Sequence, residues 1–446
     1  MPITALDDVI AAIPKRVVSL CSELRAAGKR GWVVGGCVRD SLRGLPAKDW
    51  DVATDARPEE VQKLFRRVIP TGLKHGTVTV LIGEDAFEVT TLRGEGAYVD
   101  GRRPEEVVFL DDIEHDLARR DFTFNAIAID PLDGALIDPY GGRSDLEAGV
   151  LRAVGVPLER FCEDGLRILR AARFAASLEC RVDDATLRAM GERAALDTLA
   201  RVSAERVHDE WVKSLRANRP SIAFELMRQT RVLPLHAPEL DAMAGVPLEE
   251  GADLWDHTMA VLDACPRDPV VRLAALLHDV GRPDGADDHG ARGAERADGL
   301  LARLKFSNDD RRRAVHVIRH HQVGDPTDWS DAEVRRWLVA ITPDRLEDVA
   351  ALSIANCLGR GIDPEPMAAA RRALADRARA QLEAGVALST RDLTIGGKDL
   401  MKDLGLEPGR HIGTILESLL EAVLDDPSLD DRSRLLDLAR DLAQRG

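Results

Sequence analysis

The first part of the chain is organised around Gly31-Trp32-Val33-Val34-Gly35-Gly36-Cys37-Val38-Arg39-Asp40. Its four leading residues are compatible with a short buried strand, and the glycine pair ends that strand where a helix begins. Two glycines at such a junction let backbone N–H groups approach a phosphate, and the helix dipole favours the negative charge. Arg39, one turn into the helix, can pair with phosphate oxygens. The stretch therefore predicts a strand, a turn and a helix that together receive a phosphorylated ligand.

Two acidic residues follow about ten positions later in Asp49-Trp50-Asp51-Val52-Ala53-Thr54. The segment from Asp49 to Ala53 alternates polar and apolar residues, which predicts a strand with both carboxylates on one face. Two neighbouring carboxylates repel each other, and a divalent cation such as Mg²⁺ removes that conflict through oxygen ligands. Two exposed strand aspartates without a cation are the alternative interpretation.

Along the rest of the chain, the pattern predicts a mixed α/β head followed by helices alone. We expect an N-terminal helix over 5–30 that ends near Gly28, a helix over 57–67 that begins at Pro58, and a hairpin of strands at 76–82 and 86–92. Residues 94–105 are predicted to form a mobile surface loop. From about residue 145 onward Ala, Leu, Arg and Glu dominate, which indicates long helices to the end.

Composition narrows the class of protein. The chain has 446 residues and a formal net charge of −16 at pH 7, which counts against non-specific coating of nucleic acid. It carries no apolar run of membrane-spanning length and no signal-peptide core, and its six cysteines form no CxxC pair. We therefore expect a protein of the reducing cytoplasm, without a membrane partner and without a zinc ribbon. No segment indicates a protein partner.

A second informative stretch is Glu163-Asp164-Gly165-Leu166-Arg167-Ile168-Leu169-Arg170-Ala171-Ala172-Arg173-Phe174. On one continuous helix, Asp164, Arg167 and Arg170 would span an arc of about 120° on one side, and Arg173 would lie roughly opposite Asp164. Read by itself, this is an amphipathic helix with an Asp–Arg pair three residues apart.

Taken together, these motifs resemble the head of the polymerase-β-like nucleotidyltransferases, and within them the class II tRNA CCA-adding enzymes and bacterial poly(A) polymerases. The resemblance continues through Pro70-Thr71-Gly72-Leu73-Lys74-His75-Gly76-Thr77 and Glu88-Val89-Thr90-Thr91-Leu92-Arg93. It is strongest at Asp116-Leu117-Ala118-Arg119-Arg120-Asp121-Phe122-Thr123-Phe124-Asn125-Ala126. The fold class that follows is α+β, with a small mixed α/β head before an extended all-α neck, body and tail.

The resemblance also implies roles for individual residues. Gly36 and Arg39 would contact the nucleotide triphosphate. Asp49 and Asp51 would be the catalytic pair that holds Mg²⁺, with Glu88 as a third carboxylate. The other nucleotide-binding residues implied are Arg120 and Asp121 for phosphate and ribose, Asp164 and Arg167 for the incoming base, and Arg170 and Arg173 for phosphate or support.

The resemblance further implies the reaction and the partners. CTP and ATP would supply CMP, CMP and AMP to the 3′ end of tRNA, with release of pyrophosphate. The 70–77 stretch is of the CCA type and lacks the basic run of poly(A) polymerases, and full CCA-adding enzymes use a loop such as 94–105 when they switch to ATP. A partial A- or C-adding enzyme and a poly(A) polymerase remain the alternatives.

A third motif lies in the middle of the chain. His257 and the pair His278-Asp279, which follows an apolar helix, resemble the HD phosphohydrolase pattern, with His289 as a further ligand. Such residues can hold a transition metal that activates water. The position expected to be acidic is Asn356, and a neutral amide is a poor replacement for a carboxylate on a cation. We expect His320-His321 to lie at the surface, with membership of a second metal site as the alternative. An HD-type phosphohydrolase whose head only binds RNA is the rival function.

Four parts are predicted along the chain. They are the catalytic head at 1–145, a helical neck and body with the base-selecting motif at 146–245, an HD-like helical domain at 246–360, and a helical tail at 361–446. The resemblance implies that the tail contacts the acceptor end and elbow of tRNA.

Overall fold

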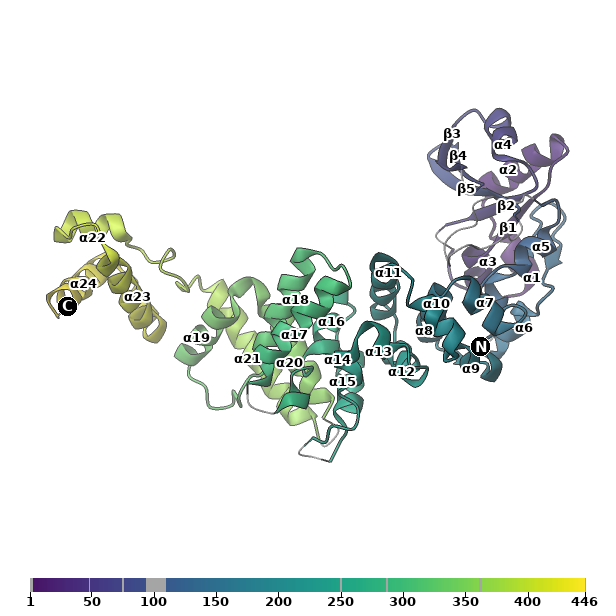
Figure 1. Cartoon of the computed structure of the whole chain (residues 1–446). Coiled ribbons are helices and arrows are strands. Elements are labelled where there is room, and N and C mark those ends of the chain that lie inside the picture. The colour runs from purple at the N-terminus through teal and green to yellow at the C-terminus, as the bar shows by residue number, and fades with distance from the viewer. Residues whose placement is uncertain are drawn as a thin grey trace. The chain divides into compact units, whose positions relative to one another are not determined.

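The computed structural model describes residues 3–47, 49–73, 76–93, 110–248, 251–285, 288–360 and 363–445, and the chain divides into two compact units (Figure 1). The N-terminal unit is Met1–His236 and the C-terminal unit is Ala237–Gly446. The loop predicted at 94–105 lies outside the described residues. The four-part division remains a prediction.

A mixed sheet forms the centre of the N-terminal unit. Within the described residues its seven strands run in the order β3-β4-β5-β2-β1-β6-β7, and β2 pairs with β5 in parallel while the other pairs are antiparallel. The strands are β1 (Gly31–Val34), β2 (Asp51–Thr54), β3 (Val68–Gly72), β4 (Thr77–Ile82), β5 (Asp85–Thr91), β6 (Ala128–Ile129) and β7 (Leu136–Ile137). A parallel pair, β8 (Val150–Leu151) and β9 (Arg181–Val182), forms a separate small sheet, so the expectation of helices alone after about residue 145 is wrong for these two short strands. The predicted hairpin is confirmed as β4 and β5.

The sheet is held by apolar side chains packed against one face. Val78 and Val80 alternate with less buried neighbours along β4, as expected for a strand with one core face. A cluster that includes Trp32, Leu92 and Leu117 is excluded from water, so the ends of β1 and β2 that carry the motif residues are anchored in a packed core.

Helices cover the sheet and continue into the neck. They are α1 (Leu6–Ala11), α2 (Lys15–Ala26), α3 (Gly36–Leu42), α4 (Pro58–Leu64), α5 (Ile113–Ala118), α6 (Gly142–Ala148), α7 (Pro157–Glu163), α8 (Leu166–Leu178), α9 (Asp184–Met190), α10 (Arg193–Leu199), α11 (Ala204–Leu215), α12 (Ser221–Gln229) and α13 (Leu233–His236). The single N-terminal helix expected over 5–30 is wrong. Two helices occur there because Pro14, which has no backbone N–H to donate, sits directly before α2.

Gly165 is required by the close approach of two backbones. A Cβ atom placed there would lie 2.3 Å from the backbone nitrogen of Leu199, at the end of α10. Real Cβ atoms do not come so close, and backbone atoms cannot swing aside as a flexible side chain can. Gly165 therefore lets the α7–α8 junction lie directly against the end of α10.

Replacing this glycine tests that packing. Gly165→Ala is expected to reduce the free energy of unfolding by about 1–3 kcal/mol, because the junction must move away from α10. The matched control, Gly299→Ala, lies inside a helix with open space around the added methyl group and should be neutral or stabilising by up to about 1 kcal/mol. Urea unfolding of the full chain followed by circular dichroism measures both. Equal effects of the two variants would contradict the packing argument.

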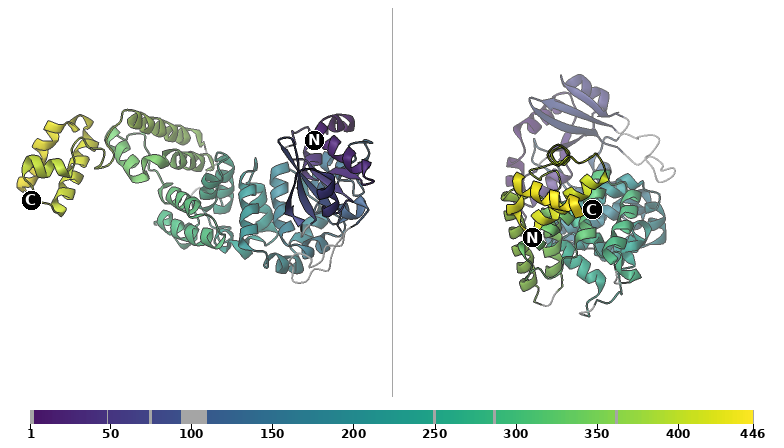
Figure 2. Two further views of the ribbon diagram at one scale, coloured as in Figure 1. Left: turned by 90° about the horizontal axis from the view of Figure 1, so that it is seen from above. Right: turned by 90° about the vertical axis from the view of Figure 1, so that its left-hand side faces the viewer.

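The regular secondary structure of the C-terminal unit is helical in the residues that the structure describes, apart from an isolated bridge between Pro247 and Asp253. Its helices are α14 (Pro238–Asp241), α15 (Leu254–Ala264), α16 (Pro269–Leu277), α17 (His289–Arg303), α18 (Asn308–His320), α19 (Asp331–Ile341), α20 (Leu346–Leu358), α21 (Glu365–Glu383), α22 (Gly397–Leu404), α23 (Arg410–Asp425) and α24 (Arg432–Arg445). The helices α22, α23 and α24 share a core that includes Leu400, Leu419 and Leu435, and Figure 2 shows them from two further sides. The α+β fold class is thus confirmed.

The apolar helices and the cysteines bear on two further expectations. None of the helices in the described residues is both long and apolar enough to span a bilayer. The six cysteines are free thiols, and Cys21, Cys37, Cys265 and Cys357 are buried.

Candidate active site

One cavity gathers most of the predicted site residues of the N-terminal unit. It encloses about 480 Å³ between the edge of the sheet and the start of α8. The predicted residues that line it are Gly36, Arg39, Asp51, Arg120, Asp121, Asp164, Arg167 and Arg170. Asp49 and Arg173 are not among its lining residues. Gly35, the first glycine of the predicted phosphate turn, also lines it. Arg119, Asn125, Leu166, Phe174 and Arg206 line it as well, and no role was predicted for these five.

The glycine turn lies at one end of this cavity. Gly35 follows β1, has φ +79° and precedes the first residue of α3. This backbone conformation is costly for residues with a Cβ atom. A Cβ at Gly35 would also lie 3.1 Å from Nη1 of Arg120. The predicted strand, turn and helix are therefore present, and the turn brings the backbone close to an arginine.

The two motif aspartates do not share a strand as expected. The strand β2 begins only at Asp51, and Asp49 lies before it with an exposed side chain. Asp51 is paired in register with Val34 on β1. The register of β2 with β5 places Asp51 beside Glu88, because Val52 pairs with Val89. The neighbouring parallel strand thus supplies the second carboxylate next to Asp51.

These carboxylates affect one another. Burial, together with the nearby carboxylates of Glu88 and Asp49, raises the pKa of Asp51 to about 6, although Arg120 acts in the opposite direction. A partly buried carboxylate surrounded by others costs free energy when it is ionised, and a divalent cation would remove that cost. The donor set of hard oxygen atoms also fits Mg²⁺.

The raised pKa predicts a pH-dependent affinity for the cation. Protons and Mg²⁺ compete for the Asp51 carboxylate, so affinity should fall by up to about tenfold per pH unit below pH ~6. In the absence of metal, the free energy of unfolding depends on pH in the opposite direction. Because the pKa of Asp51 in the folded protein lies above its usual value, the contribution of Asp51 to stability is fully present at low pH and is lost as the pH rises through about 6. Titration calorimetry with Mg²⁺ at several pH values measures the affinity. The same pH dependence in an Asp51→Asn variant would contradict the assignment.

Arginine side chains that line the cavity are held by fixed partners. Arg39 donates to Asp40 at 2.9 Å and to the side-chain oxygen of Asn125 at 2.9 Å. Arg120 donates to Asp116 at 3.2 Å, and Arg119 also pairs with Asp116. Because these guanidinium groups are already oriented, an anion entering the cavity meets positive charge with little rearrangement.

Asp121 connects the head to α8 through an ion pair with Arg170. Its carboxylate accepts hydrogen bonds from Arg170 at 2.6 Å and from the Asn125 amide at 2.9 Å. Burial acts to raise the pKa of Asp121, but Arg170 and Asn125 outweigh it, so the pKa lies below its usual value. Asp121 is therefore charged at neutral pH and joins the head to α8. Its predicted contact with ribose stays a prediction.

The neck motif is not one continuous helix. Asp164 has an extended backbone after α7, and α8 starts at Leu166. The carboxylate of Asp164 accepts from the backbone N–H of Leu166 at 3.0 Å and from Arg206 of α11 at 2.7 Å. The helical arc and the Asp164–Arg167 pair expected from sequence are therefore wrong, because an N-terminal capping position replaces the first helical turn.

The remaining motif arginines have separate partners. Arg167 pairs with Glu163 at 2.6 Å and donates to the backbone oxygen of Arg119 at 2.8 Å. Arg173 pairs with Glu210 at 2.5 Å and lies 3.8 Å over the ring of Phe174. Arg173 thus does not line the cavity itself, but it packs against Phe174, which does. Among the residues missed from sequence, Arg119 and Asn125 lay inside a quoted motif, whereas Arg206 lay in no motif.

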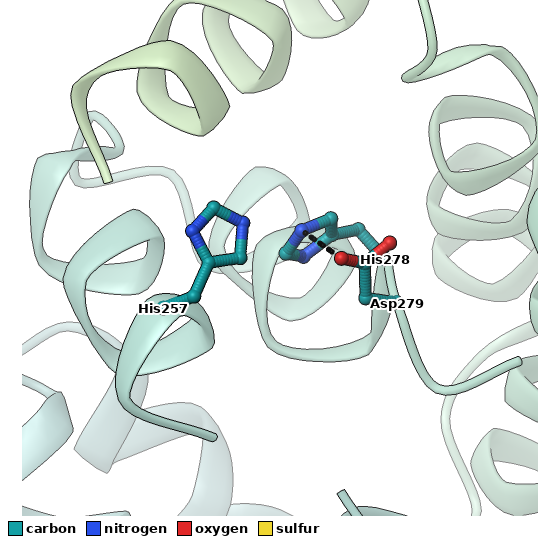
Figure 3. A group of neighbouring side chains, drawn as sticks. All are labelled: His257, His278 and Asp279. Atoms are coloured by element: carbon teal, nitrogen blue, oxygen red, sulfur yellow. Dashed lines mark ion pairs between the residues drawn. The ribbon is translucent and has the colours of Figure 1, made fainter. Parts of the chain in front are cut away.

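A second group of chemically active side chains lies in the C-terminal unit. His257, His278 and Asp279 point toward one another from α15 and the end of α16 (Figure 3). Asp279 also approaches two further rings, with its Oδ1 atom 3.2 Å from Nε2 of His289 and 3.5 Å from Nε2 of His321. The five side chains, called the histidine cluster below, are buried. The expectation that His321 lies at the surface is wrong, because the end of α18 turns it inward while His320 stays partly exposed.

The histidine cluster is arranged as metal ligands usually are. His278 and His321 each contact the backbone oxygen three residues earlier through Nδ1, at 2.7 and 2.6 Å, so Nε2 faces Asp279. Among the described residues, Nε2 of His278 and Oδ1 of Asp279 are buried and make no hydrogen bond of good geometry, although Oδ1 has the His289 and His321 rings within 3.5 Å and Oδ2 pairs with Arg282 at 2.8 Å. Burial and the neighbouring His278 lower the pKa of His257 to about 4, which keeps that ring neutral at pH 7. These buried atoms fit a bound cation.

Asn356 lies at the histidine cluster, as expected. Its side-chain oxygen is 3.0 Å from Nε2 of His257, where a hydrolase of the HD pattern would present a carboxylate. A cavity of about 430 Å³ adjoins this group and is lined by Arg282, His321, Gln322, Val323, Gly324, Asp325, Pro326, Ser353, Asn356, Cys357, Arg360, Met367, Ala370 and Arg371. Three of these are arginines, so the cavity suits an anion.

Comparisons with known proteins agree on one family. Residues 31–152 match the poly A polymerase head domain, residues 181–243 match a probable RNA and SrmB-binding site of polymerase A, and residues 292–439 match a putative domain 2 of tRNA nucleotidyltransferases. A CCA-adding enzyme of Ligilactobacillus salivarius is 31% identical over 96% of this chain and 97% of its own length. One of Limosilactobacillus fermentum is 33% identical over 95% of this chain and 96% of its own.

Solved structures show the same relationship. The crystal structure of the Bacillus stearothermophilus CCA-adding enzyme in complex with CTP superposes with a TM-score of 0.74 at 27% identity, covering 97% of this chain and 98% of that one. The Thermotoga maritima CCA-adding enzyme complexed with tRNA has a TM-score of 0.60 at 21% identity over the full length of both chains, which shows a shared fold.

Proposed function

The chain belongs to the CCA-adding enzymes, and we propose which residues bind the triphosphate, the cation and the base. It is a tRNA nucleotidyltransferase that adds CMP, CMP and AMP from CTP and ATP to the 3′ end of tRNA and releases pyrophosphate. The observation that carries the residue assignment is the 480 Å³ cavity, in which the glycine turn, Asp51 and the neck arginines face one space.

In this proposal the head binds the triphosphate and the 3′ hydroxyl. The hydroxyl oxygen attacks the α-phosphorus, the bond to the bridging oxygen breaks, and pyrophosphate leaves. The backbone at Gly35 and Gly36 and the guanidinium groups of Arg39 and Arg120 bind the phosphates and compensate their charge. A divalent cation, Mg²⁺ in our proposal, would be held by Asp49 and Asp51 with Glu88 nearby, and would supply charge compensation and hydroxyl activation.

The neck would select the base. An ionised carboxylate accepts hydrogen bonds and cannot donate them. Cytosine and adenine both present an exocyclic amino group, whereas uracil and guanine present a carbonyl oxygen at the corresponding position. Asp164 therefore suits C and A and opposes U and G. Arg167 can donate to the ring nitrogen next to that amino group.

Sequencing the products tests the function directly. The purified protein is incubated with tRNA lacking CCA and with CTP, ATP or both. The proposal expects CC with CTP alone and CCA with both. Tails of A alone, or the addition of only one kind of nucleotide when both are present, would instead identify a poly(A) polymerase or a partial enzyme.

We also propose where the substrate binds. The match of 181–243 to an RNA-binding region supports contact of that segment with tRNA. The tail at 361–446, which contains the α22–α24 core, would receive the acceptor end and elbow. Because the substrate is tRNA, we propose the cytoplasm as the place of action.

A second candidate function rests on the histidine cluster and the cavity beside it. We propose that Asp279 and the four histidines hold a transition metal and that Arg282, Arg360 and Arg371 receive a phosphate ester next to it. Asn356 argues against a complete hydrolase site because its amide carries no charge. Metal analysis and a phosphodiesterase assay with cyclic nucleotides separate the two cases: bound metal without hydrolysis identifies a binding site, and hydrolysis would make the chain bifunctional.

A further inference from the structure

We infer that Arg206 is a specificity-determining positioning residue, which holds the Asp164 carboxylate in the orientation that accepts C and A. The inference rests on the proposed role of Asp164. No part of Arg206 needs to touch the base for this effect.

The contacts of Asp164 show how little freedom its carboxylate has. One oxygen accepts from the backbone N–H of Leu166 at 3.0 Å, and the other accepts from Nη2 of Arg206 at 2.7 Å. Each carboxylate oxygen has two acceptor positions. The two contacts therefore use one position on each oxygen and leave the others for a ligand in the cavity that Asp164 lines.

Arg206 is itself anchored by the packing of α11 against α8. It lies in the first turn of α11, and Glu210 follows one turn later on the same face. Glu210 is buried and pairs with Arg173 of α8 at 2.5 Å. The ring of Trp211 packs on Phe224 with centroids 5.2 Å apart. The helix that carries Arg206 is thus tied to the helix that carries Arg167 and Arg170.

Other cations compete for Asp164 if Arg206 is removed. Arg170 lies close enough to Asp164 to interact with it electrostatically. Without its partner, the Asp164 side chain can rotate toward that guanidinium, and its acceptor positions then turn away from the base. The negative charge of Asp164 would remain in the cavity, but its acceptor positions would no longer face the base. That orientation is what lets the carboxylate distinguish an amino group from a carbonyl oxygen.

Two substitutions at one position test this. Arg206→Met keeps the length without charge, and Arg206→Lys keeps a donor and the charge. Steady-state kcat and KM are measured for CTP and for UTP on tRNA lacking CCA. Arg206→Met is expected to reduce the preference for CTP over UTP by about tenfold, mainly through a higher KM for CTP. Arg206→Lys should restore part of that preference. The control Arg193→Met removes an exposed ion pair with Asp197 on α10 and should change nothing.

The possible results separate this inference from the proposed function. If the wild-type protein incorporates neither nucleotide, the proposed function fails. If the wild type prefers CTP and Arg206→Met keeps that preference, the inference is overturned. It is also overturned if both Arg206 variants lose kcat equally for CTP and UTP without a change in preference, since that result indicates a merely structural role.

Discussion

Asp51→Asn is expected to reduce nucleotide incorporation by at least about 10³-fold, because a neutral amide can neither hold a divalent cation nor compensate the charge that develops at the transferred phosphate. The fold should survive this change. The carboxylate of Asp51 is destabilised by burial and by its acidic neighbours, as its pKa of about 6 shows. An amide of the same size removes that cost, so the midpoint of thermal unfolding should not decrease in metal-free buffer.

The measurement is incorporation of CMP into tRNA lacking CCA, together with a thermal unfolding curve of the same preparation. Glu84→Gln is the matched control, since Glu84 is an exposed acid in the turn between β4 and β5 of the same sheet. It should retain wild-type activity. An Asp51→Asn variant with more than about a tenth of wild-type activity would remove Asp51 from the catalytic centre.

The second large effect is expected at the histidine cluster. Asp279→Asn should weaken binding of a transition metal by more than about 100-fold, because even residues that only orient metal ligands contribute 10–100-fold. Asp279 approaches His278, His289 and His321 and belongs to both groups of proposed ligands, so its loss affects both groups. Incorporation of CMP should be unchanged, since the catalytic cavity is lined by residues of the N-terminal unit alone.

Elemental analysis of the purified chain and titration calorimetry with Zn²⁺ or Mn²⁺ measure this effect. His320→Asn is the control, because His320 is the sequence neighbour of His321 and stacks with His316 instead of joining the histidine cluster. Equal metal content in Asp279→Asn and the wild-type protein would show that the buried atoms bind no cation. Loss of metal in His320→Asn as well would assign the binding to a different place.

Short-range sequence patterns were sufficient to predict the glycine turn and the strands β1, β4 and β5 of the head, whereas β3, β6 and β7 were not predicted. A glycine pair after Val34 and alternating residues in the hairpin of β4 and β5 depend on backbone geometry over a few residues, and the structure contains both. Local signals failed where a boundary was set by a single residue. Pro14 divides the expected N-terminal helix, and Asp164 caps α8 instead of extending it.

Contacts between residues far apart in the sequence could be identified only from the folded structure. Glu88 reaches Asp51 only because β5 pairs in parallel with β2, Arg206 reaches Asp164 across 42 positions, and His321 reaches Asp279 because α18 ends beside the end of α16. No periodicity in the sequence encodes such pairs, because they depend on how helices and strands pack.

Carboxylates, guanidinium groups and imidazoles carry their chemistry wherever they lie, so the family, the fold class and the chemical types of the site residues could be predicted from the residues alone. Which of these groups share a cavity, and which partners orient them, follows from the packing of helices and strands. Cation binding, charge compensation and base selection depend on distances of a few ångström between side chains, and packing sets those distances.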